Sequence, residues 1–249
     1  MLCHSAFLAV TAGFVNAVAM LILAVPVGNL TGITTQLGMD TANPWRYESH
    51  AIVAILLGFL IGAAISGAVV ESNADPLGTR HAIVLGAEGM LLLLAAAGLA
   101  ERDIKTHIIA LGVEESAVQA FLAAAALGLQ NGLTSSFRGM AVRTTHFTGT
   151  VTDLGLMLGR SRKHGIEKWK AVILTVTLLL FLTGGVVGIV FGARFGGYAL
   201  LAPAAACLSI AVANVVHAFA LRRVRDDGSQ REQPAENGPE GCLGSTSSP

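Results

Sequence analysis

The chain has 249 residues, of which 53% are hydrophobic and only 13% are charged, and its formal net charge is zero. With a mean hydropathy of +0.65, it exceeds what the surface of a soluble domain can carry, so an integral membrane protein is favoured. Cys3, Cys207 and Cys242 are too few and too scattered for a disulfide framework or a metal site. We expect no cofactor, no bound metal and no nucleic-acid partner.

Six mostly apolar runs are each long enough to cross a hydrocarbon core, which takes about 20 residues. The run nearest the N-terminus lacks the basic region of a secretory signal, so we expect it to remain as a span. Glycine and alanine are dense in these runs, and small residues let helix backbones approach closely in lipid. The sequence therefore predicts an all-α integral membrane helical bundle with about six transmembrane helices, at 5–25, 51–70, 81–100, 117–135, 171–191 and 198–221.

Two connections between the predicted spans are long and partly apolar. In the first, Pro26 and Gly28 interrupt the helix before a helical pattern resumes at 30–37. In the second, the break falls near Gly139 and the pattern resumes at 147–158. Irregular backbone at membrane depth must face protein or water. We therefore expect each connection to be a short helix after a break, with its first turn capped by Asn29 or Thr145.

The two halves of the chain contain similar motifs in the same order. In each half an asparagine is followed by a Thr-Gly pair and then by a Leu-Gly pair. Each unit holds three spans, and an odd number of crossings makes the second copy enter from the opposite side. We therefore predict an inverted three-plus-three repeat of 5–100 and 117–221, as in many secondary transporters. The matching motifs are Asn16, Thr31-Gly32 and Leu37-Gly38 in the first half, and Asn131, Thr148-Gly149 and Leu154-Gly155 in the second.

The second set of motifs resembles that of the YoaK family of multi-pass membrane proteins, a domain of unknown function. The resemblance covers roughly 5–222 and implies a multi-pass fold, but it implies no activity because the family is uncharacterised. The first copy departs from the family at Asn16, where similar proteins usually carry aspartate, and at Leu30-Thr31-Gly32-Ile33, where they carry Met-Thr-Gly-Asn. The matching residues are Gly128-Leu129-Gln130-Asn131 and Val142-Arg143-Thr144-Thr145-His146-Phe147-Thr148-Gly149-Thr150-Val151-Thr152-Asp153-Leu154-Gly155.

Basic residues beside the spans predict the orientation. They are concentrated at 160–170 and 222–225, which places both termini in the cytoplasm of a cell with the protein in its plasma membrane. Residues 101–115 have an amphipathic pattern that suits the outer interface. Residues 1–225 are expected to form a single membrane domain, and the polar segment 226–249 a disordered cytoplasmic tail.

Several polar residues are predicted to lie inside the membrane. Arg143, next to the start of the second short helix, could form an anion site with the helix dipole, or it could snorkel to the interface while the threonines cap the helix. His146 and Asp153 share one helix face and could relay a proton, or Asp153 could lie among the headgroups. Glu88 lies deep in the third span, where it could serve function or hold helices together as a protonated, hydrogen-bonded group.

The side chains of Asn16, Gln130 and Asn131 are better explained as hydrogen bonds between helices than as ligand contacts, and ligand contact is the alternative. No established catalytic motif is present. The most favoured function is transport of a small solute or ion, with the lipid bilayer as the other partner and a homo-oligomer left open. The alternatives are an enzyme acting on an apolar substrate through Glu88, His146 and Asp153, and a structural or regulatory membrane protein. The candidate pathway residues are Asn16, Thr31, Glu88, Gln130, Asn131, Arg143, His146, Thr148 and Asp153.

Overall fold

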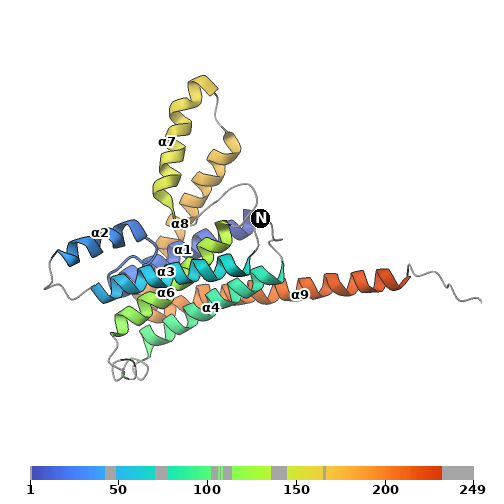
Figure 1. Cartoon of the computed structure of the whole chain (residues 1–249), viewed down its shortest axis with the longest axis horizontal. Coiled ribbons are helices and arrows are strands. Elements are labelled where there is room, and N and C mark those ends of the chain that lie inside the picture. The colour runs from blue at the N-terminus through green and yellow to red at the C-terminus, as the bar shows by residue number, and fades with distance from the viewer. Residues whose placement is uncertain are drawn as a thin grey trace, which may run out of the picture.

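The computed structural model describes residues 2–42, 49–70, 78–101, 106, 108, 114–135, 145–164 and 167–231. All regular secondary structure in these residues is helical, which confirms the predicted all-α class (Figure 1). Most of the amphipathic segment 101–115, together with Gly139 and Arg143, lies outside the described residues. The helices are α1 (Leu2–Leu23), α2 (Leu30–Thr41), α3 (Ser49–Val69), α4 (Thr79–Ala100), α6 (Glu115–Ser135), α7 (Phe147–His164), α8 (Lys168–Phe195), the 3-10 helix η1 (Gly196–Leu200) and α9 (Leu201–Arg231).

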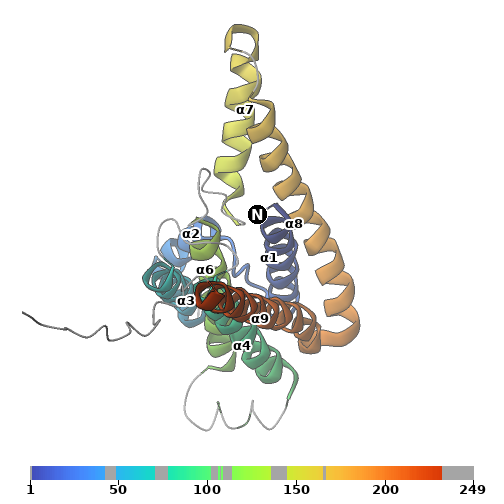
Figure 2. The same cartoon turned by 90° about the vertical axis from the view of Figure 1, so that its right-hand side faces the viewer.

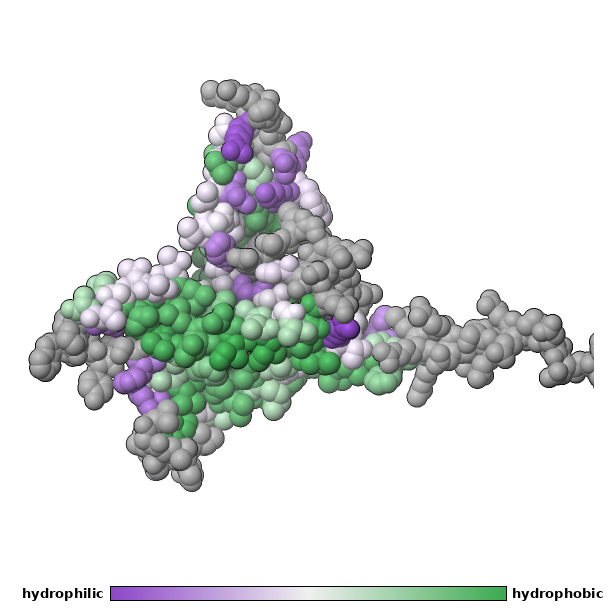
Figure 3. Space-filling model, viewed as in Figure 1, coloured by the Kyte–Doolittle hydropathy of each residue, from purple (hydrophilic) through white to green (hydrophobic). Residues whose placement is uncertain are grey.

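Four segments of the described helices are long and apolar enough to cross a membrane: His4–Leu23, His50–Val69, Thr79–Ala100 and Lys168–Ala220. The last of them runs through α8, η1 and α9, so it contains two of the predicted spans. Large apolar side chains are exposed on the outer faces of α3, α8 and α9, and Figure 3 shows an apolar surface over the bundle. These apolar helices indicate a membrane protein, because such a surface is suited to lipid tails rather than to water.

Helix α6 is not among these four segments, although it was predicted as a span. It is buried along most of its length, between α3, α4 and α1. Its lower apolar content has a structural reason, since a helix enclosed by other helices can carry polar side chains that a lipid-facing helix cannot. The buried polar residues of α6 are Gln119, Gln130, Asn131 and Thr134.

The helices α3 and α6 are in close contact and run parallel. A Cβ placed on Gly58 would lie 2.5 Å from the carbonyl oxygen of Phe121, and one on Gly62 would lie 2.1 Å from that of Ala125. Later residues of α3 therefore face later residues of α6. Both distances are too short for a real Cβ, so glycine is what permits this separation of the two backbones.

The helices α1 and α8 form a second parallel pair, and Figure 2 shows them side by side. A Cβ placed on Gly184 would lie 2.1 Å from the carbonyl oxygen of Val10, and one on Gly188 would lie 2.7 Å from that of Phe14. In contrast, α4 and α9 are antiparallel, because the end of α4 meets η1 while the start of α4 faces the middle of α9.

The contacts of the first half recur in the second half at matching positions. When Asn16 is aligned with Asn131, Gly13 corresponds to Gly128. A Cβ on Gly13 would lie 2.0 Å from the carbonyl oxygen of Phe181, and one on Gly128 would lie 2.3 Å from that of Phe59. Both phenylalanines lie in the segments that the sequence repeat pairs, so one pattern of backbone contact occurs twice in the bundle.

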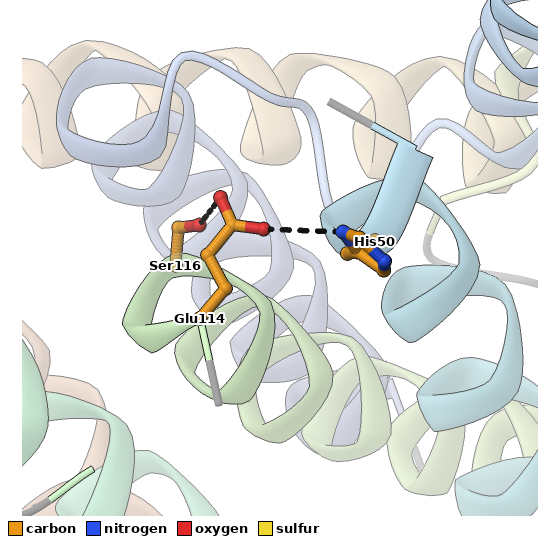
Figure 4. A network of polar contacts seen from close by, with 3 residues as sticks. All are labelled: His50, Glu114 and Ser116. Carbon is orange, nitrogen blue, oxygen red and sulfur yellow. Dashed lines mark hydrogen bonds and ion pairs between the residues drawn. The ribbon is translucent and has the colours of Figure 1, made fainter. Parts of the chain in front are cut away.

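A polar network joins the starts of α3 and α6 (Figure 4). The Glu114 carboxylate accepts a hydrogen bond from Ser116 Oγ at 2.7 Å, and its other oxygen lies 3.7 Å from His50 Nδ1. At the C-terminal end of α4, the Tyr198 hydroxyl donates a hydrogen bond to the carboxylate of the C-cap residue Glu101. These groups are exposed, so their contribution to stability is small.

Helix α7 and the first part of α8 project away from the other helices (Figures 1 and 2). This projecting hairpin is more polar on its surface than the bundle (Figure 3). At the other end of the chain, α9 continues to Arg231, so the predicted tail begins with helical backbone at 226–231. Residues 232–249 lie outside the described residues, and their disorder stays a prediction.

Candidate functional site

The first break follows α1, which ends at Leu23. Ala24 has a φ of 58°, a left-handed conformation that a helix cannot continue through. Pro26 then lacks the amide hydrogen that a helix needs. The chain turns helical again at Leu30, and the N-cap Asn29 accepts a hydrogen bond from the amide of Gly32 at 3.1 Å. The interruption therefore falls at the predicted residues.

A partly buried hydrogen bond from α1 holds this break in place. The side-chain oxygen of Asn16 accepts from the amide of Gly28 at 2.8 Å. An unpaired backbone amide costs free energy wherever water does not reach it. Asn16 therefore has a structural partner, and it positions the segment that leads into α2.

The second break has a corresponding contact. The hydroxyl of Thr145 donates to the side-chain oxygen of Asn131 at 3.2 Å, and the Asn131 amide nitrogen donates to the carbonyl of Leu127 at 2.8 Å. Thr145 precedes Thr148 by three residues, as Gly28 precedes Thr31. In each half, the equivalent asparagine therefore accepts a hydrogen bond from the residue three positions before the threonine of the Thr-Gly pair. The donor is a backbone amide in the first half and a side-chain hydroxyl in the second.

The two breaks meet each other beside a cavity of about 450 Å³. A Cβ placed on Gly28 would lie 3.4 Å from the methyl carbon of Thr145. Both α2 and α7 begin at the wall of this cavity. Its lining consists of Gly28, Asn29, Leu30, Thr31, Phe59, Ala63, Asn131, Gly132, Ser135, Thr145, His146, Phe147 and Thr148.

The cavity offers unpaired backbone hydrogen-bond donors. Among the described residues, the amides of Leu30, Thr31, Phe147 and Thr148 have no hydrogen-bond acceptor, as expected for the first turns of two helices. The positive ends of both helix dipoles are thus directed to one space. Among the described lining residues none is a carboxylate, and His146 is the titratable one. The cavity therefore suits a small solute that carries hydrogen-bond acceptors.

The structure brings four of the predicted residues together at the cavity wall, namely Thr31, Asn131, His146 and Thr148. Asn16 lies behind the wall, bonded to Gly28. Gln130 is turned to α1, where its amide nitrogen donates to the carbonyl of Leu8. Arg143 lies outside the described residues, so its predicted part in an anion site stays a prediction.

Glu88 is fully buried in α4 and does not line the cavity. Its neighbour is the Cys207 thiol of α9. The thiol is not placed to give a normal hydrogen bond, and within the described chain neither carboxyl oxygen of Glu88 has a partner. An ionised carboxylate here would lack both a countercharge and a donor, so this site favours the neutral acid.

Asp153 is bound to a lysine rather than to the cavity. Its Oδ2 lies 3.6 Å from Lys170 Nζ of α8, and both side chains are partly exposed. The neighbouring Thr150 hydroxyl donates to the carbonyl of His146 at 3.2 Å and so bonds within α7. Glu88, His146 and Asp153 therefore occupy three different environments and do not form one catalytic group.

Phe59, Ala63 and Ser135 also lie in the cavity wall, although no sequence motif pointed to them as site residues. Ser135 could have been found, because it follows Asn131 by one helical turn and shares its face. Phe59 corresponds in the repeat to Phe181, which instead packs on Phe147 with ring centroids 4.4 Å apart. The two halves therefore use equivalent phenylalanines differently, and sequence similarity alone does not reveal which one faces the cavity.

These features define a helical membrane protein in which the residues that lead into α2 and α7 line a half-open cavity. The chain belongs to the family described as "Protein of unknown function (DUF1275)", whose profile matches residues 4–213. This match confirms a domain of unknown function, as the motifs implied, while the name YoaK is not confirmed by it. A comparison with curated proteins and one with solved structures returned no match.

Proposed function

We propose that this protein is a secondary transporter for a small polar solute or ion, which binds in the cavity between the two breaks. The observation that carries the proposal is the cavity itself, because both short helices begin there with free amides. Transporters with interrupted helices bind their substrates at such helix ends, where unpaired backbone groups are available. A volume of about 450 Å³ lies within the range of ordinary small-ligand sites.

Six spans in an inverted three-plus-three repeat are part of this proposal. The directions of the helices support it: α1 is parallel to α8, α3 is parallel to α6, and α4 is antiparallel to α9. A two-fold axis in the membrane plane would exchange α1 with α6, α3 with α8 and α4 with α9. The α1–α8 pair would then superpose on the α6–α3 pair, and α4 would superpose on α9 with its direction reversed. The matched contacts of Gly13 and Gly128 agree with the same axis.

Transport fits these features better than catalysis does. Alternating access needs two similar halves around one site, whereas an enzyme does not. The acid and base groups that an enzyme would use are separated, because Glu88 lies at Cys207 and Asp153 at Lys170. A purely structural role does not explain why the first turns of two helices from opposite halves of the chain meet at one cavity.

Uptake into proteoliposomes tests the proposal. A panel of labelled small anions, neutral solutes and cations is offered to the purified protein, with and without an imposed pH gradient. We expect at least one solute to accumulate above empty liposomes. Replacing Thr31 and Thr148 by valine should lower its apparent affinity by about tenfold, because about one net hydrogen bond is lost on each side of the cavity.

The matched control replaces Thr35 and Thr152 by valine. These threonines lie on the same two short helices but outside the lining, and their hydroxyls bond to the carbonyls of Thr31 and Thr148. This control should retain uptake. No accumulation of any solute by folded protein, or equal losses in both pairs of variants, would refute the cavity as a transport site.

We further propose that the protein lies in the plasma membrane with both termini in the cytoplasm. Reporter fusions after Gly165 and after Gly228 should both report a cytoplasmic location, because the basic residues around 160–170 and 222–225 are retained on that side. A fusion at Gly112 is the control and should report the opposite side. An external signal at Gly165 or Gly228 would contradict the six-span inverted arrangement.

A further inference from the structure

An apolar groove lies between the start of α1 and the first half of α8, away from the polar cavity. It has a volume of about 280 Å³. Ser5 and Ala6 of α1 form one side, and α8 forms the other with a stripe of mostly apolar residues. Its exposed surface is almost entirely apolar, so it cannot bind a polar solute or pair with a peptide backbone. The α8 residues of the groove are Trp169, Val172, Ile173, Val176, Thr177 and Leu180.

Positive charge is concentrated at the open end of this groove. Lys168 and Lys170 flank Trp169 in the first turn of α8. The N-cap Glu167 makes no side-chain capping hydrogen bond, so the first amides of α8 remain available to an anion. From Asp153 to Lys170 the chain carries five basic and two acidic residues, which makes this end of the α7–α8 hairpin positive overall.

Trp169 marks the boundary between the groove and the charged end. Its side chain is 64% exposed although it also lines the groove. Tryptophan is enriched at the level of lipid headgroups, because its ring is apolar while its N–H remains hydrated. Along α8 the apolar groove is therefore followed by Trp169 and then by the basic first turn. This order matches that of a phospholipid, in which the acyl chain is followed by the glycerol region and then by the phosphate.

We propose that this groove is a binding site for an anionic phospholipid of the surrounding bilayer. One acyl chain lies along Val172 and Val176, and the phosphate lies at the first turn of α8 beside Lys168. A zwitterionic lipid binds less well, because its own cation offsets the attraction of the lysines. Lys170 shares its charge with Asp153 at 3.6 Å, so Lys168 is the main contact.

Fluorescence quenching of Trp169 tests this site. The chain has two tryptophans, so the Trp45→Phe variant leaves Trp169 as the single reporter. The variant is placed in phosphatidylcholine vesicles that contain a rising fraction of either phosphatidylglycerol or phosphatidylcholine with brominated acyl chains. We expect brominated phosphatidylglycerol to reach half-maximal quenching at a mole fraction on the order of tenfold lower, since two lysines attract its headgroup.

Charge variants in the same background separate this site from ordinary contact with lipid. Lys168→Gln with Lys170→Gln should abolish the preference, whereas Asp153→Asn should increase it by freeing Lys170. Arg194→Gln, in the last turn of the same helix, is the matched control and should leave the preference unchanged. Equal quenching by both lipids in the parent protein, or an unchanged preference without the two lysines, would overturn the proposal. Neither outcome depends on whether the protein transports a solute.

Discussion

Gly62→Val is expected to disrupt the packing of α3 on α6 and to lower the thermal stability of the protein strongly. A Cβ on Gly62 would lie 2.1 Å from the carbonyl oxygen of Ala125, a backbone atom that cannot move aside. The helices would have to separate, and overpacking of this kind costs about 1–3 kcal/mol or more. The measurement is the melting temperature of detergent-solubilised protein, determined by size-exclusion chromatography of samples heated to increasing temperatures.

The matched control is Gly67→Val on the same helix, where an added Cβ meets nothing within 4 Å. It should leave the melting temperature nearly unchanged. Gly184→Val should behave like Gly62→Val, because its Cβ would lie 2.1 Å from the carbonyl oxygen of Val10. A stable, monodisperse Gly62→Val protein would show that the close approach of α3 and α6 is not as described.

Glu88→Met is expected to raise the melting temperature while it abolishes any uptake driven by a pH gradient. The carboxyl group is fully buried without a hydrogen-bond partner among the described residues, a situation that costs about 1–3 kcal/mol relative to a satisfied group. Methionine fills a similar volume and removes that cost. Acids inside membrane helices often take part in proton exchange, so we expect Glu88 to couple uptake to the pH gradient.

Glu88→Gln separates the two effects, because glutamine keeps a polar side chain but cannot exchange a proton. It should remain folded and lose the response of uptake to the pH gradient. Glu101→Gln is the control, since Glu101 lies at the exposed end of α4 and an amide oxygen can still accept from Tyr198. Full pH-dependent uptake by both Glu88 variants would exclude Glu88 as the coupling group, and a destabilised Glu88→Met would assign it a structural role instead.

Local sequence was sufficient to predict most of the helices and the position of the first break. Apolar runs of span length predicted α1, α3, α4, α6 and α8 to within a few residues, because in a membrane helix length and composition are set by the bilayer. The start of α9 was predicted equally well, but this helix continues past the predicted end at 221 to Arg231. Pro26 and Gly28 predicted the first break, because neither residue favours a continuous helix. The matched order of asparagine and Thr-Gly pairs predicted two equivalent halves.

The spatial grouping of the polar residues was decided by the tertiary structure alone. Asn131, His146 and Thr148 share a cavity wall with Thr31 because the two breaks meet, although each of them is 100 or more residues away from Thr31 in the chain. Glu88 was expected at the same cavity, but the crossing of α4 and α9 places it beside Cys207. A sequence fixes which residues are polar at membrane depth, whereas the helix crossings determine which of them face one another.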